Sequence, residues 1–351
     1  MISDLLREEI KRFKNYEVYN IECKYKMDAN EIPFKLPETT IENLQEIVCN
    51  ANVNRYPDPV SMKLKKRLSE YCGVLPENIM VGNGSDELIH IIMNAFVDVN
   101  DYVIYPMPSF SMYKVYAQIA GANRIEISLN DDYSYDADKF INAIKKYNPK
   151  VTILCTPNNP TGTVISKEDI IKILKHNHGL TVVDEAYYEF YGETVVDLIK
   201  DYENLIVLRT LSKAYGLAGL RVGYLVANVE TVKCLSMVKS PYNVNSISQA
   251  IALNVLESDV IKNRVEYIKN ERQYLLNELN TIQGIKIYPS NANFILIKFN
   301  NADYVYNKLI KCGILVRNFS KDPGLYETLR ITIGTREANN YLVKCLKEIL
   351  Q

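Results

Sequence analysis

The sequence predicts an α/β protein in which a large domain, built on a mostly parallel sheet, is followed by a smaller α+β domain. Two observations support this fold class. Short, nearly continuous apolar runs recur through the first two thirds of the 351 residues, separated by stretches with helical periodicity, and the pattern changes after Ser246. A chain of this length exceeds one ordinary domain and can bury a large core.

The expected strands of the large domain are apolar on both faces, which is typical of a parallel sheet covered by helices on both sides. Between two of them, Ser166-Lys-Glu-Asp169 resembles a capping box and predicts the start of a helix. The seven strands are expected at residues 78–81, 102–105, 124–128, 151–155, 180–183, 205–208 and 223–226.

After Ser246 the periodicity predicts one long helix to about Leu279, then strands at 293–298, 314–317 and 329–333 and a final helix from about Ala338. We therefore expect three parts. An N-terminal arm, residues 1–54, packs against the small domain or a partner subunit. Residues 55–245 form the large domain, and residues 246–351 form the linking helix and the small domain.

The bulk properties limit the possible functions. The net charge of -1 gives no electrostatic basis for binding nucleic acid, and no apolar run is long enough to span a membrane. The first residues are charged and lack an apolar signal core, and the seven cysteines are scattered without a CxxC spacing. We expect a cytoplasmic protein with reduced thiols and no bound metal.

Lys213 is bracketed by small and apolar residues, and Arg221 follows eight positions later. Such surroundings favour the neutral, nucleophilic amine that a Schiff-base lysine requires, whereas the arginine keeps its charge and can hold an anion. Most lysines are solvated surface groups, so Lys213 alone is weak evidence. However, the segments 157–162, 184–187 and 212–213 each follow a predicted strand directly, and ligands of open α/β sheets bind at that edge.

Asp184 ends a buried run, so its carboxylate lies at the mouth of a strand. It is equally well explained as a turn or helix cap and as an ion-pair partner for a cofactor's ring nitrogen. The turn Val81-Gly-Asn-Gly-Ser85 lies where a strand gives way to a helix, and exposed N–H groups there make an anion site. A glycine-rich turn is not specific evidence. With it, however, the following residues would complete a phosphate cup: Ser85, Asp86, Ser212 and Arg221.

The segments 158–162, 183–187 and 208–224, in this order, resemble the pyridoxal-phosphate (PLP) aminotransferases of fold type I, the class I and II family. The resemblance extends from about Met27 to Gly334. It implies a large PLP-binding domain, a homodimer with shared active sites, and PLP bound to Lys213 as a Schiff base. Once displaced by the amine substrate, Lys213 would act as the general base and acid of proton transfer.

The resemblance also assigns cofactor contacts. It implies that Asn159 donates its amide to the phenolate oxygen of the cofactor and that Tyr187 places its phenol beside the same group. It places an aromatic residue at Phe110 over the ring, although a core phenylalanine is an equal explanation. Tyr56 would reach the phosphate bound by the partner subunit. In this arrangement Asp184 would form the ion pair with the ring nitrogen of the cofactor.

An inward arginine in an apolar strand requires an anion, and the resemblance gives Arg330 the substrate carboxylate or its equivalent. Arg317 is a second such case, for which a surface ion pair is an equal explanation. A second anion site suits a phosphorylated substrate, and Lys26–Glu31, with Asn30, resembles the substrate segment of the subfamily that uses L-histidinol phosphate. The expected reaction gives imidazole-acetol phosphate and glutamate from histidinol phosphate and 2-oxoglutarate, in histidine biosynthesis.

The same scaffold supports other functions, so the fold does not fix the substrate. A threonine-phosphate decarboxylase also binds a phosphorylated amine, and a broad aromatic amino-acid aminotransferase is a further alternative. A ligand-sensing aminotransferase-like regulatory domain is more remote, because the chain has neither room for a DNA-binding domain nor a basic patch.

Overall fold

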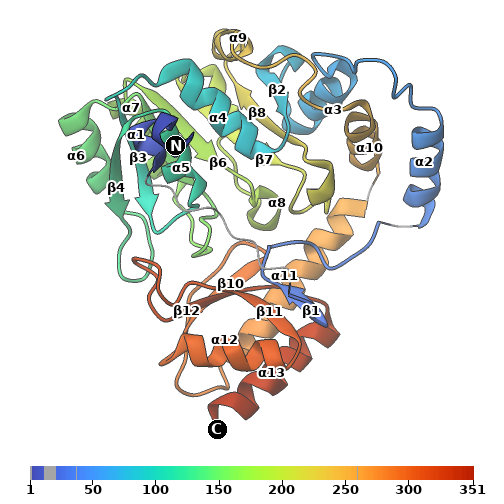
Figure 1. The fold of residues 1–351 in the computed structure, drawn as a ribbon, viewed down its shortest axis with the longest axis vertical. Helices are drawn as coiled ribbons and strands as arrows, with labels where there is room; N and C mark the ends of the chain where they lie inside the picture. The colour runs from blue at the N-terminus through green and yellow to red at the C-terminus, as the bar shows by residue number, and fades with distance from the viewer. Residues whose placement is uncertain (1, 12–20, 37, 259) are drawn as a thin grey trace.

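The computed structural model describes residues 2–11, 21–36, 38–258 and 260–351. The chain forms two sheets, one of seven strands and one of five. The seven-stranded sheet and its helices make up the upper part of the molecule in Figure 1, and the five-stranded sheet lies below it with α12 and α13. The long helix α11 (Val260–Leu279) runs between the two parts.

The seven-stranded sheet confirms the predicted mostly parallel arrangement. Strands β4, β3, β5, β6 and β7 are parallel to one another, whereas β8 is antiparallel to both β7 and β2. In order across the sheet the strands are β2 (Ile79–Gly82), β8 (Gly223–Ala227), β7 (Leu205–Thr210), β6 (Leu180–Asp184), β5 (Val151–Cys155), β3 (Tyr102–Met107) and β4 (Asn123–Ser128).

Helices cover both faces of this sheet, and its central strands are therefore buried along their whole length. Successive residues belong to different cores: Val182 and Ile206 pack on one face, and Val183 and Val207 on the other. The helices of this part are α3 (Met62–Cys72), α4 (Ser85–Phe96), α5 (Met112–Ile119), α6 (Ala137–Tyr147), α7 (Lys167–His176), α8 (Tyr188–Tyr191), α9 (Val229–Ser236) and α10 (Ser246–Leu256), with short 3-10 turns at Pro76–Asn78, Val196–Lys200 and Ala218–Leu220.

The five-stranded sheet contains the three C-terminal strands that the sequence predicts and two that it does not. In order across the sheet the strands are β1 (Tyr25–Met27), β11 (Ile314–Asn318), β12 (Thr328–Thr332), β10 (Phe294–Lys298) and β9 (Lys286–Ile287), and the helices are α12 (Ala302–Lys311) and α13 (Arg336–Leu350). The N-terminal strand β1 pairs parallel with β11, so part of the N-terminal arm is an edge of this sheet.

The single long helix expected from Ser246 to Leu279 is wrong. The chain forms α10, which ends at Leu256, and a separate α11, which begins at Val260. At the end of α10 the Ser258 hydroxyl donates a hydrogen bond to the Val255 carbonyl, 2.7 Å away. A serine hydroxyl that donates to a helix carbonyl competes with the backbone N–H groups for that acceptor. The sequence has no glycine or proline at this point to mark the end of the helix.

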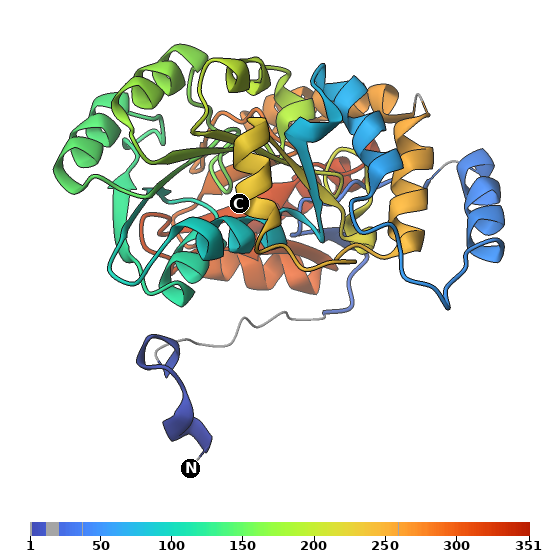
Figure 2. The same cartoon turned by 90° about the horizontal axis from the view of Figure 1, so that it is seen from above.

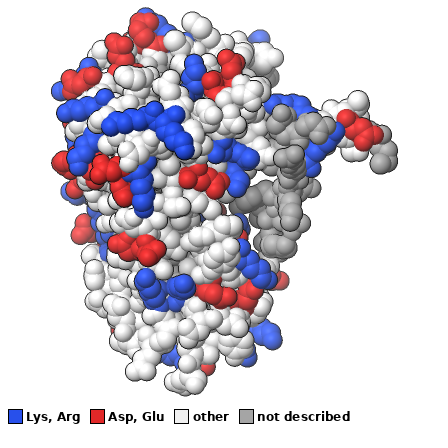
Figure 3. Space-filling model, turned by 90° about the vertical axis from the view of Figure 1, so that its left-hand side faces the viewer, with Lys and Arg blue, Asp and Glu red and all other residues white. Residues whose placement is uncertain are grey.

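Helix α2 (Glu38–Cys49) lies at the rim beside α10, as Figures 1 and 2 show, and the first residues form a 3-10 turn (Ile2–Leu5) and α1 (Glu8–Lys11). On the face drawn in Figure 3, basic and acidic side chains are interspersed. Among the helices that the structure describes, none has the length and apolar character required to cross a bilayer.

Candidate active site

Three loops meet where the central strands of the large sheet end. Strands β5, β6 and β7 are adjacent and parallel, so their carboxyl ends lie at one edge. The loop after β5 carries Asn159, β6 itself ends at Asp184, and the loop after β7 carries Ser212 and Lys213. The crevice predicted from three separate segments of the sequence is therefore a single place in the fold.

The Lys213 amine is held in a nearly enclosed position. Its Nζ donates a hydrogen bond to the Ala29 carbonyl at 3.0 Å and lies 5.9 Å from the centre of the Tyr187 ring. Burial, together with the positive charge of Arg330, lowers the pKa of Lys213 to about 8. At pH 7 about a tenth of this amine is consequently neutral, far more than for an ordinary lysine, and the neutral form is the one that acts as a nucleophile or proton acceptor.

Asp184 is buried and accepts two hydrogen bonds. The Tyr113 hydroxyl donates to its Oδ2 at 2.7 Å, and the Ala186 backbone N–H donates to its Oδ1 at 3.0 Å. Burial raises the pKa of Asp184 to about 6, while the two hydrogen bonds act in the opposite direction. The bond to Ala186 is the local turn contact that a capping aspartate makes. The bond from Tyr113, which lies 71 positions away in the sequence, is not a capping contact.

Tyr187 is also buried, and burial raises its pKa above the usual value. Its hydroxyl accepts a hydrogen bond from the Asn30 side-chain amide at 2.9 Å. Asn30 is itself fixed: its N–H donates to the Thr332 hydroxyl at 3.0 Å, and its carbonyl accepts from the Asn293 side chain at 3.0 Å. Asn30, expected as a substrate contact, thus lies where it orients Tyr187.

The glycine-rich turn after β2 forms a close cradle. Helix α4 begins at Ser85, and a Cβ added to Gly223 on β8 would lie 2.4 Å from the Ser85 nitrogen, so only glycine allows the helix start to approach the strand. Arg221 contacts Asp86, with 3.3 Å between Nη2 and Oδ2, and a Cβ at Gly84 would lie 2.6 Å from the same Nη2.

This cradle has the donors that an anion requires. The start of a helix presents unsatisfied N–H groups, and Arg221 adds a permanent positive charge beside them. Ser212, on the loop that carries Lys213, is buried and has its N–H bonded to the Thr210 hydroxyl at 3.1 Å.

Arg330 connects the small sheet to the crevice. Its guanidinium donates to the Asn159 side-chain oxygen at 2.5 Å and to the Asp28 carbonyl, and it lies 5.4 Å from the centre of the Phe294 ring. Arg317 on β11 is the register partner of Arg330 on β12, and opposite residues of an antiparallel pair share a face. Both guanidiniums also lie 5.7 Å from the centre of the Phe319 ring, so the two arginines stand side by side.

The two remaining aromatic residues differ in their surroundings. Phe110 packs edge-on against Tyr113, with ring centres 5.5 Å apart, and so lies near Asp184. Tyr56 is 82% exposed, and its ring stacks on Tyr242 at 4.5 Å. Within one chain, Tyr56 is a surface residue.

Sequence reasoning missed Tyr113, Thr332 and Asn293. Each is bonded to a predicted site residue from a distant part of the chain, and such long-range pairing leaves no local pattern. Tyr113 lies in the first turn of α5, three positions after Phe110, which precedes the helix, and this closeness in sequence was the available signal.

Comparisons with known proteins agree with this geometry. A family model described as aminotransferase class I and II matches residues 23–346. The chain is 62% identical over 350 residues to a histidinol-phosphate aminotransferase of Thermoanaerobacter sp. (strain X514), and the match covers 100% of each.

Solved structures give the same result. A histidinol-phosphate aminotransferase from Clostridium acetobutylicum is 27% identical with a TM-score of 0.85, covering 93% of this chain and 98% of that one. Another, from Sinorhizobium meliloti in complex with pyridoxal-5'-phosphate, is 25% identical with a TM-score of 0.87, covering 94% and 91%.

The chain belongs to the class I and II aminotransferases. Enzymes of this family depend in general on PLP, and the residues present fit that cofactor. An amine whose pKa is lowered to about 8, a buried carboxylate and a glycine cradle with an arginine surround one crevice.

Proposed function

We propose that the protein is a histidinol-phosphate aminotransferase, which transfers the amino group of L-histidinol phosphate to 2-oxoglutarate. The relative that is 62% identical over the whole chain bears that name. The observation in the structure that carries the proposal is the pair Arg317 and Arg330, because a phosphorylated amine and a dicarboxylic keto acid must be bound in turn by one pocket.

The proposed cofactor contacts divide among the residues of the crevice. The cradle at Ser85, Asp86, Ser212 and Arg221 would hold the phosphate of PLP, and Asp184 would face the ring nitrogen. Asn159 and Tyr187 would lie at the ring oxygen, and Phe110 against the ring face. When bound, PLP supplies an electron sink for the carbon that loses and regains a proton.

The chain's own residues would supply binding and proton transfer. Lys213 would hold the cofactor covalently and, once displaced, its amine, whose pKa is about 8, would accept and return a proton. Asp184, ionised at neutral pH, would pair with the ring nitrogen. Arg330 orients the α-carboxylate of glutamate, and Arg317 binds the distal group, either the substrate phosphate or the glutamate side chain.

The test of the proposal is a comparison of amines on the purified holoenzyme. Half-reaction spectra should show fast conversion with histidinol phosphate and much slower conversion with histidinol, threonine phosphate or tyrosine. Release of carbon dioxide from threonine phosphate without a keto acid would favour the decarboxylase, and preference for tyrosine would favour an aromatic aminotransferase. Either result would overturn the substrate proposal.

Replacing Arg317 with glutamine should narrow the preference for histidinol phosphate over histidinol by about 10- to 100-fold. The reason is that a charge-assisted hydrogen bond to phosphate is worth roughly 1.5–3 kcal/mol. The measurement is kcat/KM for both amines in both proteins. The rate with histidinol, which has no phosphate, serves as the internal control and should change little; an unchanged ratio would contradict the role given to Arg317.

Replacing Tyr113 with phenylalanine should move the pH at which PLP affinity begins to fall. Only the ionised carboxylate of Asp184 pairs with the ring nitrogen, so affinity falls as the pH drops below the pKa of about 6. The Tyr113 hydroxyl stabilises the charged form, so its removal raises that pKa by about one unit and affinity weakens from about pH 7 downwards. Cofactor binding followed by absorbance across pH 5–8 measures this shift.

The matched control for this experiment is Tyr105→Phe. The Tyr105 hydroxyl donates to Glu126 at 3.1 Å, away from the site. In that variant the pH below which PLP affinity falls should therefore stay near 6. If PLP affinity in Tyr113→Phe also fell only below about pH 6, Tyr113 would pack against Asp184 without changing its pKa.

We further propose a homodimer in which Tyr56 serves the partner's cofactor phosphate. Its exposed ring, held by stacking on Tyr242, is the support for this. Mixing a Tyr56→Ala protein with a Lys213→Ala protein should restore activity, because each heterodimer contains one site with both defects and one with neither. The two variants refolded together, with each refolded alone as a control, test this. Heterodimers without recovered activity would place the role of Tyr56 in its own subunit.

A further inference from the structure

The side chain of Asn243 ties the glycine-rich turn of the phosphate cradle to a distant loop. Asn243 lies between α9, which ends at Ser236, and α10, which begins at Ser246. Its Nδ2 donates a hydrogen bond to Glu87 Oε2 at 2.6 Å and contacts the Val81 carbonyl at 3.4 Å. Val81 lies on β2, before the turn, and Glu87 lies on α4, after it. The Asn243 amide therefore contacts both sides of the turn.

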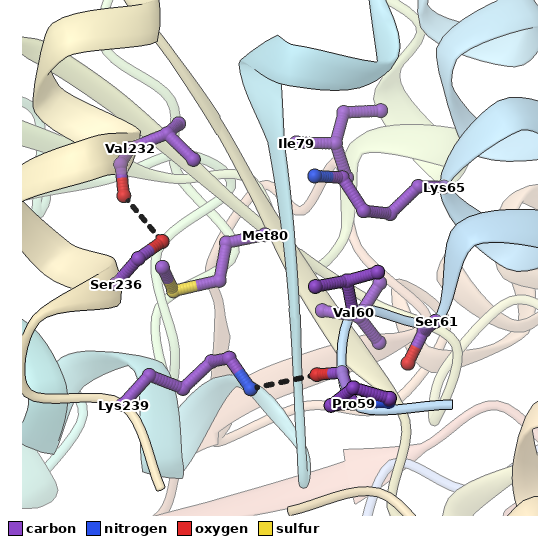
Figure 4. A pocket seen from close by; sticks show the side chains of 10 residues that line it. Pro59, Val60, Ser61, Lys65, Ile79, Met80, Val232, Ser236 and Lys239 are labelled. Atoms are coloured by element: carbon purple, nitrogen blue, oxygen red, sulfur yellow. Dashed lines mark hydrogen bonds between the residues drawn. The ribbon is translucent and has the colours of Figure 1, made fainter. Parts of the chain in front are cut away.

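Lys239 holds the other end of this amide. Its Nζ donates to the Asn243 side-chain oxygen at 3.0 Å, to the Ser240 carbonyl at 3.1 Å and to the Pro59 carbonyl at 3.2 Å. Figure 4 shows the last of these bonds. An ammonium only donates and a carboxylate only accepts, so the Asn243 oxygen must face Lys239 and its nitrogen must face Glu87. The amide consequently has one orientation.

Glu87 acts on the backbone of the turn. Its Oε2, which accepts from Asn243, also accepts from the Asn83 N–H at 2.6 Å. The carboxylate lies close against the turn, because a Cβ added to Gly82 would be 3.3 Å from the same oxygen. Gly84 has a φ of +81°, in the region that favours glycine, so the turn has a specific shape that Glu87 helps to fix.

Helix capping explains only part of this arrangement. A glutamate at the third position of a helix commonly accepts a backbone N–H at the helix start, and Glu87 is the third residue of α4. Capping does not require Asn243, which lies 156 positions further along the chain. It also does not require that Asn243 be fixed from its other end by Lys239.

The shape of the turn is important for an anion, because the backbone sets the directions of the N–H groups that bind it. We propose that Asn243 is a positioning residue for the cofactor phosphate. Held by Lys239, its amide keeps the Glu87 carboxylate on the Asn83 N–H, and the start of α4 is thereby preorganised before the cofactor binds. This inference rests on the cofactor site proposed above and adds a residue that does not touch the cofactor.

The test compares PLP with pyridoxal, which lacks the phosphate, on the full-length protein freed of cofactor. Asn243→Ala should weaken PLP affinity by about 3- to 10-fold, the effect of losing one ordinary hydrogen bond, and leave pyridoxal affinity unchanged. Inorganic phosphate, measured as a competitor of PLP, should also bind more weakly to the variant. Absorbance titrations give the two cofactor affinities.

Asn243→Asp is a second variant of nearly the same shape. It keeps an acceptor for Lys239 but cannot donate to Glu87, and the two carboxylates repel each other. PLP affinity should therefore fall further than in Asn243→Ala, again without loss for pyridoxal. An equal fall for PLP and pyridoxal in these variants would make Asn243 an ordinary structural residue, and unchanged PLP affinity in both would give it no role. Either result overturns the proposal.

The wild-type protein separates this inference from the proposed cofactor site. A wild type that binds PLP no more tightly than pyridoxal would remove the phosphate cradle itself, and the role of Asn243 with it. A wild type that prefers PLP, with variants that keep the full preference, would overturn the role of Asn243 alone.

Asn94→Ala is the matched control, because Asn94 lies on α4 but is exposed and contacts His90 at 3.1 Å. It should bind both ligands as the wild type does. A double variant tests the route of the effect. In a Glu87→Ala background, Asn243→Ala should cause little further loss of PLP affinity, because Asn243 acts through Glu87. Fully additive losses would contradict the proposal.

Discussion

Replacing Lys213 with alanine should abolish turnover, with a loss of about 10⁴-fold or more. Both roles proposed for this amine, covalent attachment and proton transfer, disappear together, and positioned acid–base catalysis alone contributes about 10²–10⁴-fold. The fold should persist, because the amine makes one hydrogen bond, to the Ala29 carbonyl. PLP should still bind through its phosphate, but borohydride should no longer fix it to the protein.

The measurement combines turnover with peptide mapping after reduction. In the wild type, label should be found on Lys213 alone. Lys233→Ala, at an exposed position on α9, is the control and should retain both label and activity. Label on another lysine in the wild-type protein would contradict the assignment of the crevice as the cofactor site.

The second large effect is expected for Asp184→Asn, which should lose about 10²–10³-fold of activity while keeping the fold. A neutral amide cannot hold the proton of the ring nitrogen, and loss of one member of a buried charge pair costs about 3–5 kcal/mol. The capping explanation gives the opposite result, because asparagine caps as well as aspartate does. The Ala186 N–H contact would survive the change.

Asp136→Asn is the matched control. Asp136 caps α6 by accepting from the Asp138 and Lys139 N–H groups, so the same chemical change should alter neither activity nor stability there. Turnover of Asp184→Asn close to the wild-type rate would show Asp184 to be a structural cap.

Most of the fold could be predicted from the sequence, because its strands and helices produce local patterns of apolar and polar residues. All seven strands of the large sheet and the three main strands of the small sheet lie where apolar runs predict them. Strand β1 was missed although residues 21–27 alternate between apolar and polar side chains; the strand itself is only three residues long, and its pairing with Ile314 and its neighbours defines it. The helix break after Leu256 was missed because no glycine or proline marks it.

The candidate site divides in the same way. Lys213, Asp184 and Asn159 could be predicted as neighbours because each lies at or just after the carboxyl end of a strand, and such positions meet at one edge of a parallel sheet. The contact of Tyr113 with Asp184 and the contact of Asn30 with Tyr187 could not, because they join residues 71 and 157 positions apart. Patterns within a segment contain no information about such distances.

The three residues after β1 touch three parts of the crevice: Asp28 accepts from Arg330, Ala29 from Lys213, and Asn30 donates to Tyr187. This has a consequence for biosynthesis. The segment is synthesised well before Arg330 and Thr332, its partners 302 positions later. The nascent large sheet can form while the crevice is still open on this side, and closure of the crevice must await the synthesis of β12.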